Sequence, residues 1–235
     1  MLFDPRAKVP KNPELEKQSA VLFGKHVSKQ KAIILFAFTM IACALPILLG
    51  TRMWESIPEV ISSGRIFPNG KEDAIPRWAM VYGFPAFFCL LNAITHAQLY
   101  LHQKNMKLPP SHIRIMGRFG FSVFSVLFCV GMLYKAAGKG FIQPTVMLPA
   151  AVGLMVMMLG AHMYECPQDA RISLAFAVKT EQDHKSVHRF AGICWLIGGL
   201  ILTAVSMMTE NAGYICVGTL VILGTAPIAY AKIKA

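Results

Sequence analysis

The sequence predicts an all-α integral membrane protein, a bundle of six transmembrane helices with both termini in the cytoplasm. Three observations carry this prediction: the chain is rich in apolar residues, these residues form long runs, and the basic residues are distributed unevenly between the connecting segments. Of the 235 residues, 55% are hydrophobic and 15% are charged. About a quarter of the residues of a soluble domain are charged, so an ordinary water-soluble core is excluded.

Six apolar stretches are long enough to cross a bilayer, which requires roughly 20 helical residues. They are Ala32–Gly50, Ala79–Leu101, Phe119–Ala137, Phe141–Met163, Phe190–Met208 and Ala212–Ala231. The only charged residue in them is Lys135, near the end of the third. Continuous hydrophobicity favours helices over barrel strands, which would alternate over about ten residues. Short connections after the third and fifth stretches predict antiparallel neighbours, and hence one membrane domain over residues 32–235.

The uneven distribution of positive charge predicts the orientation. Of the 23 Lys and Arg residues, 17 lie in the N-terminal segment 1–31, in the connections after the second and fourth stretches, and in the C-terminal tail. The others are Arg52, Arg65, Lys71, Arg77, Lys135 and Lys139. Both termini should therefore be cytoplasmic, and segment 1–31 should be a basic arm that could form an interfacial helix. We attribute the net charge of +11 to attraction between the inner face and anionic lipids, and not to nucleic-acid binding.

The second stretch carries polar side chains that hydrocarbon would not accept. Asn92 and His96 are four residues apart and so share one face of a helix. Because exposing either side chain to lipid is costly, this face should point into the bundle. The pair fits two interpretations, a polar or proton-sensitive cavity and an interhelical hydrogen-bond cluster.

His184 and His188 are also four residues apart, in a polar segment that leads into the fifth stretch. On a helix that begins near Glu181 they would share a face and match half of a zinc site. However, Lys185 stands where the HExxH pattern of metalloproteases has its Glu base. We therefore predict no metal and no other cofactor, with these two histidines as weak metal candidates. No nucleophile pattern or pair of buried carboxylates predicts catalysis.

A set of residues ends the fourth stretch, continues through the following loop and enters the fifth stretch. They are Gly160, Met163, Pro167, Glu181, His188, Arg189, Gly192, Gly198 and Gly199. With these residues, segment 159–201 resembles the C-terminal signature of the SdpI/YhfL family of bacterial membrane proteins. The family has six spans and an inside N-terminus, in agreement with the topology predicted from charge.

The long external loop, residues 51–78, carries a weaker resemblance to the same family. Gly70 and Asp73 match a Gly-x-x-Asp pattern that family members carry before the second span, although the His that precedes this pattern is missing. The chain also departs from the family in the cytoplasmic loop, where Ser173–Val178 replaces Arg-Thr-Pro-Trp-Thr-Leu. This departure predicts a lost or an altered role for that loop.

The resemblance implies a multi-pass protein of the bacterial plasma membrane that gives immunity to a membrane-active peptide or toxin, or signals its presence. It also implies a cytoplasmic docking segment that recruits a soluble regulator. The residues of this segment would be Glu181, His184, His188, Arg189 and Gly192. Two alternatives stay open: a small transporter or a subunit of a larger membrane complex, and a membrane enzyme or metal-binding protein that uses histidines. The sequence favours a role without catalysis.

Overall fold

The computed structural model describes residues 29–66, 72–105, 111–164, 174, 181–209 and 212–234. It has six helical spans long and apolar enough to cross a membrane, as the sequence predicts, and the first of them, Gln30–Arg52, joins two of the helices named next. The helices are α2 (Lys29–Ala44), α3 (Pro46–Arg52), α4 (Phe84–Asn105), α5 (Ser111–Ala136), α6 (Pro144–Met163), α7 (Glu181–Met208) and α8 (Ala212–Lys234), with short turns η1 (Trp54–Ser56) and η2 (Ala79–Gly83). Most of the basic segment predicted for residues 1–31 lies outside the described residues, and its last three residues begin α2.

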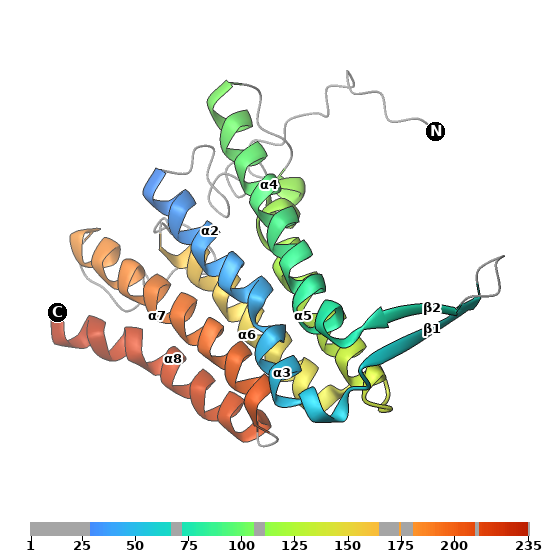
Figure 1. Cartoon of the computed structure of the whole chain (residues 1–235). Coiled ribbons are helices and arrows are strands. Elements are labelled where there is room, and N and C mark those ends of the chain that lie inside the picture. Colours follow the sequence, from blue (N-terminus) through green and yellow to red (C-terminus); the bar gives the residue numbers. More distant parts are fainter. Residues whose placement is uncertain are drawn as a thin grey trace, which may run out of the picture.

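The helices run up and down through one bundle, with α2 and α3 in the middle (Figure 1). The helices α4 and α5 pack on one side of this central span, and α6, α7 and α8 lie on the other. Large buried side chains of the central span and of α5 and α6, among them Leu49, Leu133 and Met157, form the core. Neighbours in sequence are therefore antiparallel neighbours in space, as the short connections predict.

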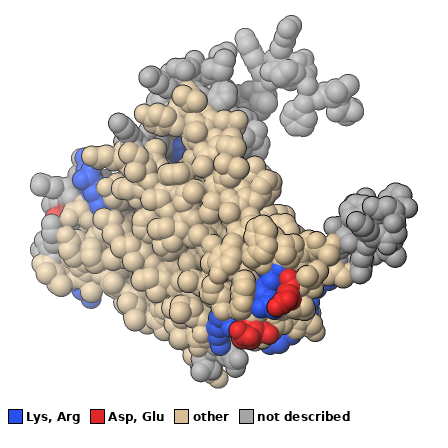
Figure 2. Space-filling model, in the orientation of Figure 1, with Lys and Arg blue, Asp and Glu red and all other residues tan. Residues whose placement is uncertain are grey.

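The surface of the bundle suits a bilayer. Figure 2 shows a broad face with almost no charged side chains, and the Lys, Arg, Asp and Glu residues that it shows lie toward the edges of the molecule. Exposed large residues such as Leu148, Val217 and Ile222 lie on the outer faces of α6 and α8. Water would not favour so much exposed apolar surface, whereas lipid would.

Pro46 decides where the first span bends. It has no N–H for the preceding helical turn, and the span breaks there into α2 and α3. Beside the break, the Ser125 hydroxyl of α5 donates a hydrogen bond of 2.8 Å to the Cys43 carbonyl. A backbone acceptor near the bend is thus satisfied by a neighbouring helix, as the interior of a membrane requires.

The connection between α5 and α6 is tighter than a hydropathy pattern reveals. Gly138 has a φ of 73°, and the Lys139 N–H donates a 2.9 Å hydrogen bond to the Tyr134 carbonyl. This Schellman geometry ends α5, and glycine adopts the left-handed conformation without a steric penalty from Cβ. The fourth span then begins at Pro144, and not at Phe141 as the apolar run predicts, because proline suits the first turn of a helix.

The loop predicted to be external, residues 51–78, contains a two-stranded antiparallel sheet that the sequence analysis does not predict. Strand β1 (Val60–Ile66) pairs with β2 (Glu72–Pro76), with Ile61 opposite Ile75 and an irregularity between Ser62 and Ile66. The hairpin projects away from the helices at the end of the bundle where α3 ends (Figure 1). Its short strands and their irregular register account for the missing alternation signal.

Candidate functional site

The residues that resemble the SdpI/YhfL signature meet where α6 and α7 touch through their backbones. A Cβ placed on Gly160 would lie 2.9 Å from the Gly192 carbonyl oxygen, and a Cβ on Gly192 would lie 2.7 Å from the backbone of Tyr164. Further along the same contact, a Cβ on Gly199 would lie 2.5 Å from the Gly153 carbonyl oxygen. Pairs of glycines seven residues apart on each helix therefore allow this close approach, a common device for packing helices in membranes.

Next to this contact, His188 holds Leu174, a residue of the connection between α6 and α7. The Leu174 N–H donates a hydrogen bond of 2.8 Å to His188 Nε2. The opposite ring nitrogen, Nδ1, lies 2.9 Å from the His184 carbonyl oxygen one turn earlier. The two imidazole rings stack with centroids 3.8 Å apart, and only 1% of His188 and 2% of His184 is exposed. We call this arrangement the His188 clamp.

The partners of His188 fix its proton and limit its chemistry. Because a backbone N–H only donates, Nε2 must accept, and the proton therefore lies on Nδ1, which donates to the His184 carbonyl. Both ring nitrogens are thus occupied, so a metal ion or a transferred proton would first have to break the clamp. No group of three or more His, Cys, Asp or Glu residues gathers around a possible metal within the part of the chain that the structure describes.

The predicted docking segment divides into buried and exposed positions. Helix α7 begins at Glu181, where the sequence analysis considers a helix start. Its first turns therefore precede the apolar stretch that begins at Phe190. Arg189 is exposed, whereas His184, His188 and Gly192 are buried. Among the predicted docking residues with described side chains, direct contact with a partner therefore falls to Arg189, and the buried histidines can act only through Leu174, which His188 holds. The side chain of Glu181 lies outside the described residues. Binding by this segment stays a prediction.

The intramembrane pair joins three helices. Asn92 of α4 is fully buried, and its Nδ2 donates a 3.0 Å hydrogen bond to the hydroxyl of Thr39 on α2, which in turn donates to the Leu35 carbonyl. His96 Nε2 lies 3.0 Å from the Arg118 carbonyl oxygen on α5, so this nitrogen carries the proton and donates. The interhelical hydrogen bonds of the second interpretation are thus present. Thr39 is the partner that the sequence analysis misses, although a lone polar residue in the first stretch could have indicated it.

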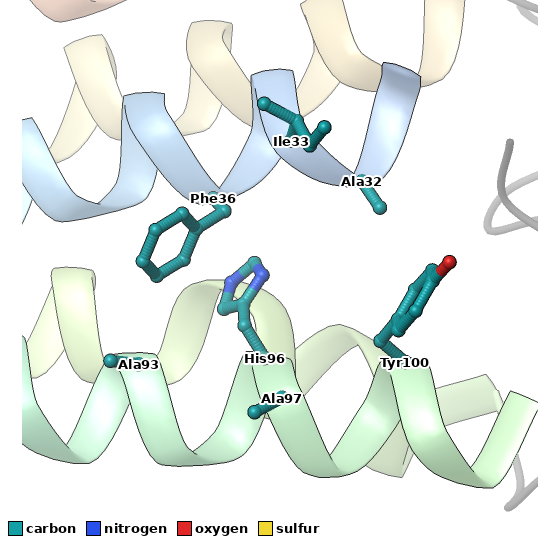
Figure 3. A pocket seen from close by; sticks show the side chains of 7 residues that line it. All are labelled: Ala32, Ile33, Phe36, Ala93, His96, Ala97 and Tyr100. Carbon is teal, nitrogen blue, oxygen red and sulfur yellow. The ribbon is translucent and has the colours of Figure 1, made fainter. Parts of the chain in front are cut away.

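His96 also lines a pocket of about 300 Å³ between α2 and α4. Figure 3 shows its ring rising from α4 toward Phe36 of α2, with Tyr100 one turn away on the same side. The Phe36 and His96 ring centroids are 5.6 Å apart. The other lining residues are Ala32, Ile33, Ala93 and Ala97. The walls are almost entirely apolar, so the pocket suits an acyl chain or an apolar side chain better than an ion.

The structure does not test Gly70 and Asp73, the candidates in the loop predicted to be external. Gly70 lies outside the described residues. Asp73 belongs to β2, and only its backbone is described. Any role of these two residues stays a prediction.

Replacing His188 with Ala should release the loop at Leu174. The Leu174 amide would lose its acceptor, and this partly buried hydrogen bond contributes about 1–2 kcal/mol. We expect amide hydrogen exchange at Leu174 to become about tenfold faster, the ratio that corresponds to ~1.4 kcal/mol. Exchange measured by mass spectrometry on the detergent-solubilised protein checks this. His188→Gln is the control, because its side-chain oxygen can still accept from Leu174; equal exchange in wild type and His188→Ala would contradict the clamp.

Comparison of the chain with protein-family models, with curated proteins and with solved structures gave no match. The fold and the site therefore define a class, a helical protein with six helices long and apolar enough to cross a membrane. Resemblance to the SdpI/YhfL family stays a prediction from the sequence.

Proposed function

We propose that this chain is a bacterial plasma-membrane protein of the SdpI/YhfL type, which gives immunity to a membrane-active peptide or signals its presence. One observation supports the proposal: four of the residues that make the sequence resemblance lie together in the structure. Gly160, Gly192 and Gly199 are the glycines of the α6–α7 contact, and His188 is the clamp beside it.

An apolar groove between α5 and α6 supports the binding of a membrane-active peptide. It has a volume of about 580 Å³, and its walls are aromatic and methionine side chains, among them Phe124, Phe128, Phe141 and Met158. Methionine side chains adapt to irregular apolar surfaces. A peptide that diffuses in the bilayer would reach this groove from the side, without passing through water.

The start of α7 supports the recruitment of a soluble regulator. Arg189 and Lys185 are both exposed there, one turn apart, next to the clamp that holds Leu174. An acidic surface on a soluble regulator would suit this basic turn. On the predicted topology, with both termini in the cytoplasm, the turn and the loop face the cytoplasm.

The test is survival of a sensitive bacterium that carries the protein and is challenged with membrane-active peptides, at matched membrane levels of each variant. We expect wild type and His188→Gln to protect, and His188→Ala to reduce protection because the loop is released. Arg189→Glu should also reduce it, because the exposed charge would repel an acidic partner, although the clamp remains intact. If the wild type protects against none of the peptides, the proposal is wrong.

The outer face of α8 favours a second candidate, a subunit of a larger membrane complex. A Cβ placed on Gly213, Gly218 or Gly224 would meet no atom within 4 Å. Small residues on a lipid-facing surface allow another helix to approach closely. Cross-linking from cysteines placed at these positions, followed by identification of the captured membrane protein, distinguishes this candidate from immunity by a protein acting alone.

A further inference from the structure

A polar pocket of about 410 Å³ lies where the end of α3, the α5–α6 turn and the start of α6 meet. We call it the outer pocket, since the charge distribution predicts this end of the bundle to be external. Its polar walls include Arg52, Ser56, Lys139, Gln143 and Thr145. Leu49, Met53 and Val146 form an apolar floor. A pocket with cations at its rim and apolar side chains below suits a ligand with an anionic head.

Two cations of the outer pocket have no acid partner among the described residues. Arg52 is the last residue of α3, and Lys139 follows the turn that ends α5; both are exposed. The Lys139 ammonium lies 5.6 Å from the centroid of the Tyr134 ring, a contact that leaves its three donors available. No Asp or Glu lines the described walls of the pocket. The described walls of the pocket therefore carry only positive charge.

The amino end of α6 adds a third positive element. Gln143, the N-cap residue, makes no capping hydrogen bond, and its side chain donates instead to the Gly140 carbonyl at 2.8 Å. Pro144 has no N–H, and the amides of Val146 and Met147 both bond to the Gln143 carbonyl. The Thr145 amide is thus the donor of the first turn that can serve a ligand. The first turn contains no acidic residue, and a helix of this length carries about half a positive charge at this end.

We infer that the outer pocket binds a phosphate group, held by Arg52, Lys139 and the amino end of α6. Arginine, lysine and helix amino ends are the common binders of phosphate in proteins. The pocket lies where the apolar parts of the first, third and fourth spans end. It is therefore at the depth of lipid head groups, and an anionic phospholipid is one source of the phosphate. Free phosphate is the other. The inference does not depend on the proposed function.

Two acidic residues are neighbours, in the sequence, of residues that line the outer pocket. Glu55 precedes Ser56; it is exposed and does not line the pocket. Glu210 follows the lining residue Thr209 and lies outside the described residues.

The experiment measures the melting temperature of the full-length protein in maltoside detergent as a ligand is added. The ligands are dihexanoylphosphatidylglycerol, a phosphate-free glycolipid of the same chain length, and inorganic phosphate, with sodium chloride matching ionic strength. The variants are Arg52→Gln, Lys139→Gln and their combination. Lys135→Gln is the control, because Lys135 is exposed at the same end of α5 and does not line the pocket.

We expect the half-saturating concentration to rise about fivefold for each cation removed, since a basic residue near a lipid surface contributes about 1 kcal/mol. Lys135→Gln should leave it unchanged. Stabilisation by phosphatidylglycerol and not by free phosphate assigns the site to a lipid head group, and the converse assigns it to free phosphate. The inference is overturned if neither ligand stabilises the wild type more than the glycolipid does. It is also overturned if the double variant responds like the wild type.

Discussion

Replacing Gly160 with Leu should prevent α6 and α7 from packing and should abolish most of the folded protein recovered in detergent. A Cβ at this position would lie 2.5 Å from the Leu196 nitrogen and 2.8 Å from the Trp195 carbonyl carbon. Both are backbone atoms of the facing helix, which cannot turn aside as a side chain can. Overpacking of a core typically costs about 1–3 kcal/mol, and we expect the upper end of that range or more. The measurement is the monodisperse fraction after size exclusion, together with the melting temperature.

Gly218→Leu on α8 is the matched control for this prediction. It introduces the same side chain into a helix of the same membrane protein, but a Cβ there meets no atom within 4 Å. Its effect should stay within about 0.5 kcal/mol, as for other surface substitutions. If Gly160→Leu and Gly218→Leu were recovered and melted alike, the backbone contact between α6 and α7 would not be present in the folded protein.

The membrane fold follows from the sequence because the spans are a property of composition along the chain. A long run without charged residues needs no partner to be recognised, and all six predicted runs coincide with long apolar helices. Boundaries were predicted less well where local backbone chemistry decides them. Pro144 delays the start of α6 beyond the predicted Phe141, whereas α7 begins at Glu181, the start that the sequence analysis considers.

The candidate site was only partly predictable, because its contacts join positions far apart in the chain. The four-residue spacing of His184 and His188 indicates a shared helix face, and the structure stacks the two rings. No sequence pattern indicates that the partner of His188 is the backbone amide of Leu174. Likewise Arg52 and Lys139 are ordinary interfacial cations in the sequence, and only the fold brings them to one pocket.

In the contact between α7 and α8, a proline of α8 leaves a backbone carbonyl that needs a hydrogen-bond donor from α7. Pro227 lies inside α8 and has no N–H, so the Leu223 carbonyl one turn earlier loses its helical partner. The Trp195 indole N–H of α7 donates to this carbonyl at 2.7 Å. In hydrocarbon, an unpartnered carbonyl is costly. Trp195 therefore supplies the hydrogen bond that the Leu223 carbonyl of α8 lacks, in addition to packing against this helix.

Trp195→Phe should accordingly destabilise the protein, by about 1–3 kcal/mol for the buried carbonyl that it leaves without a donor. The same substitution should cost less in a Pro227→Ala background. The backbone N–H that this background restores would then bond to the Leu223 carbonyl in the ordinary helical way. Unfolding of the four proteins by denaturant in the same detergent gives the double-mutant cycle.

The cycle separates the hydrogen bond from the loss of aromatic volume. The smaller Phe ring removes similar packing in both backgrounds, so that contribution cancels in the interaction free energy. A coupling of about 1 kcal/mol or more between Trp195 and Pro227 would show that the indole replaces the donor that the proline lacks. Additive effects of the two substitutions would mean that the Leu223 carbonyl finds another donor when Trp195 is absent. Helix α8 would then not depend on α7 to satisfy its backbone at the proline.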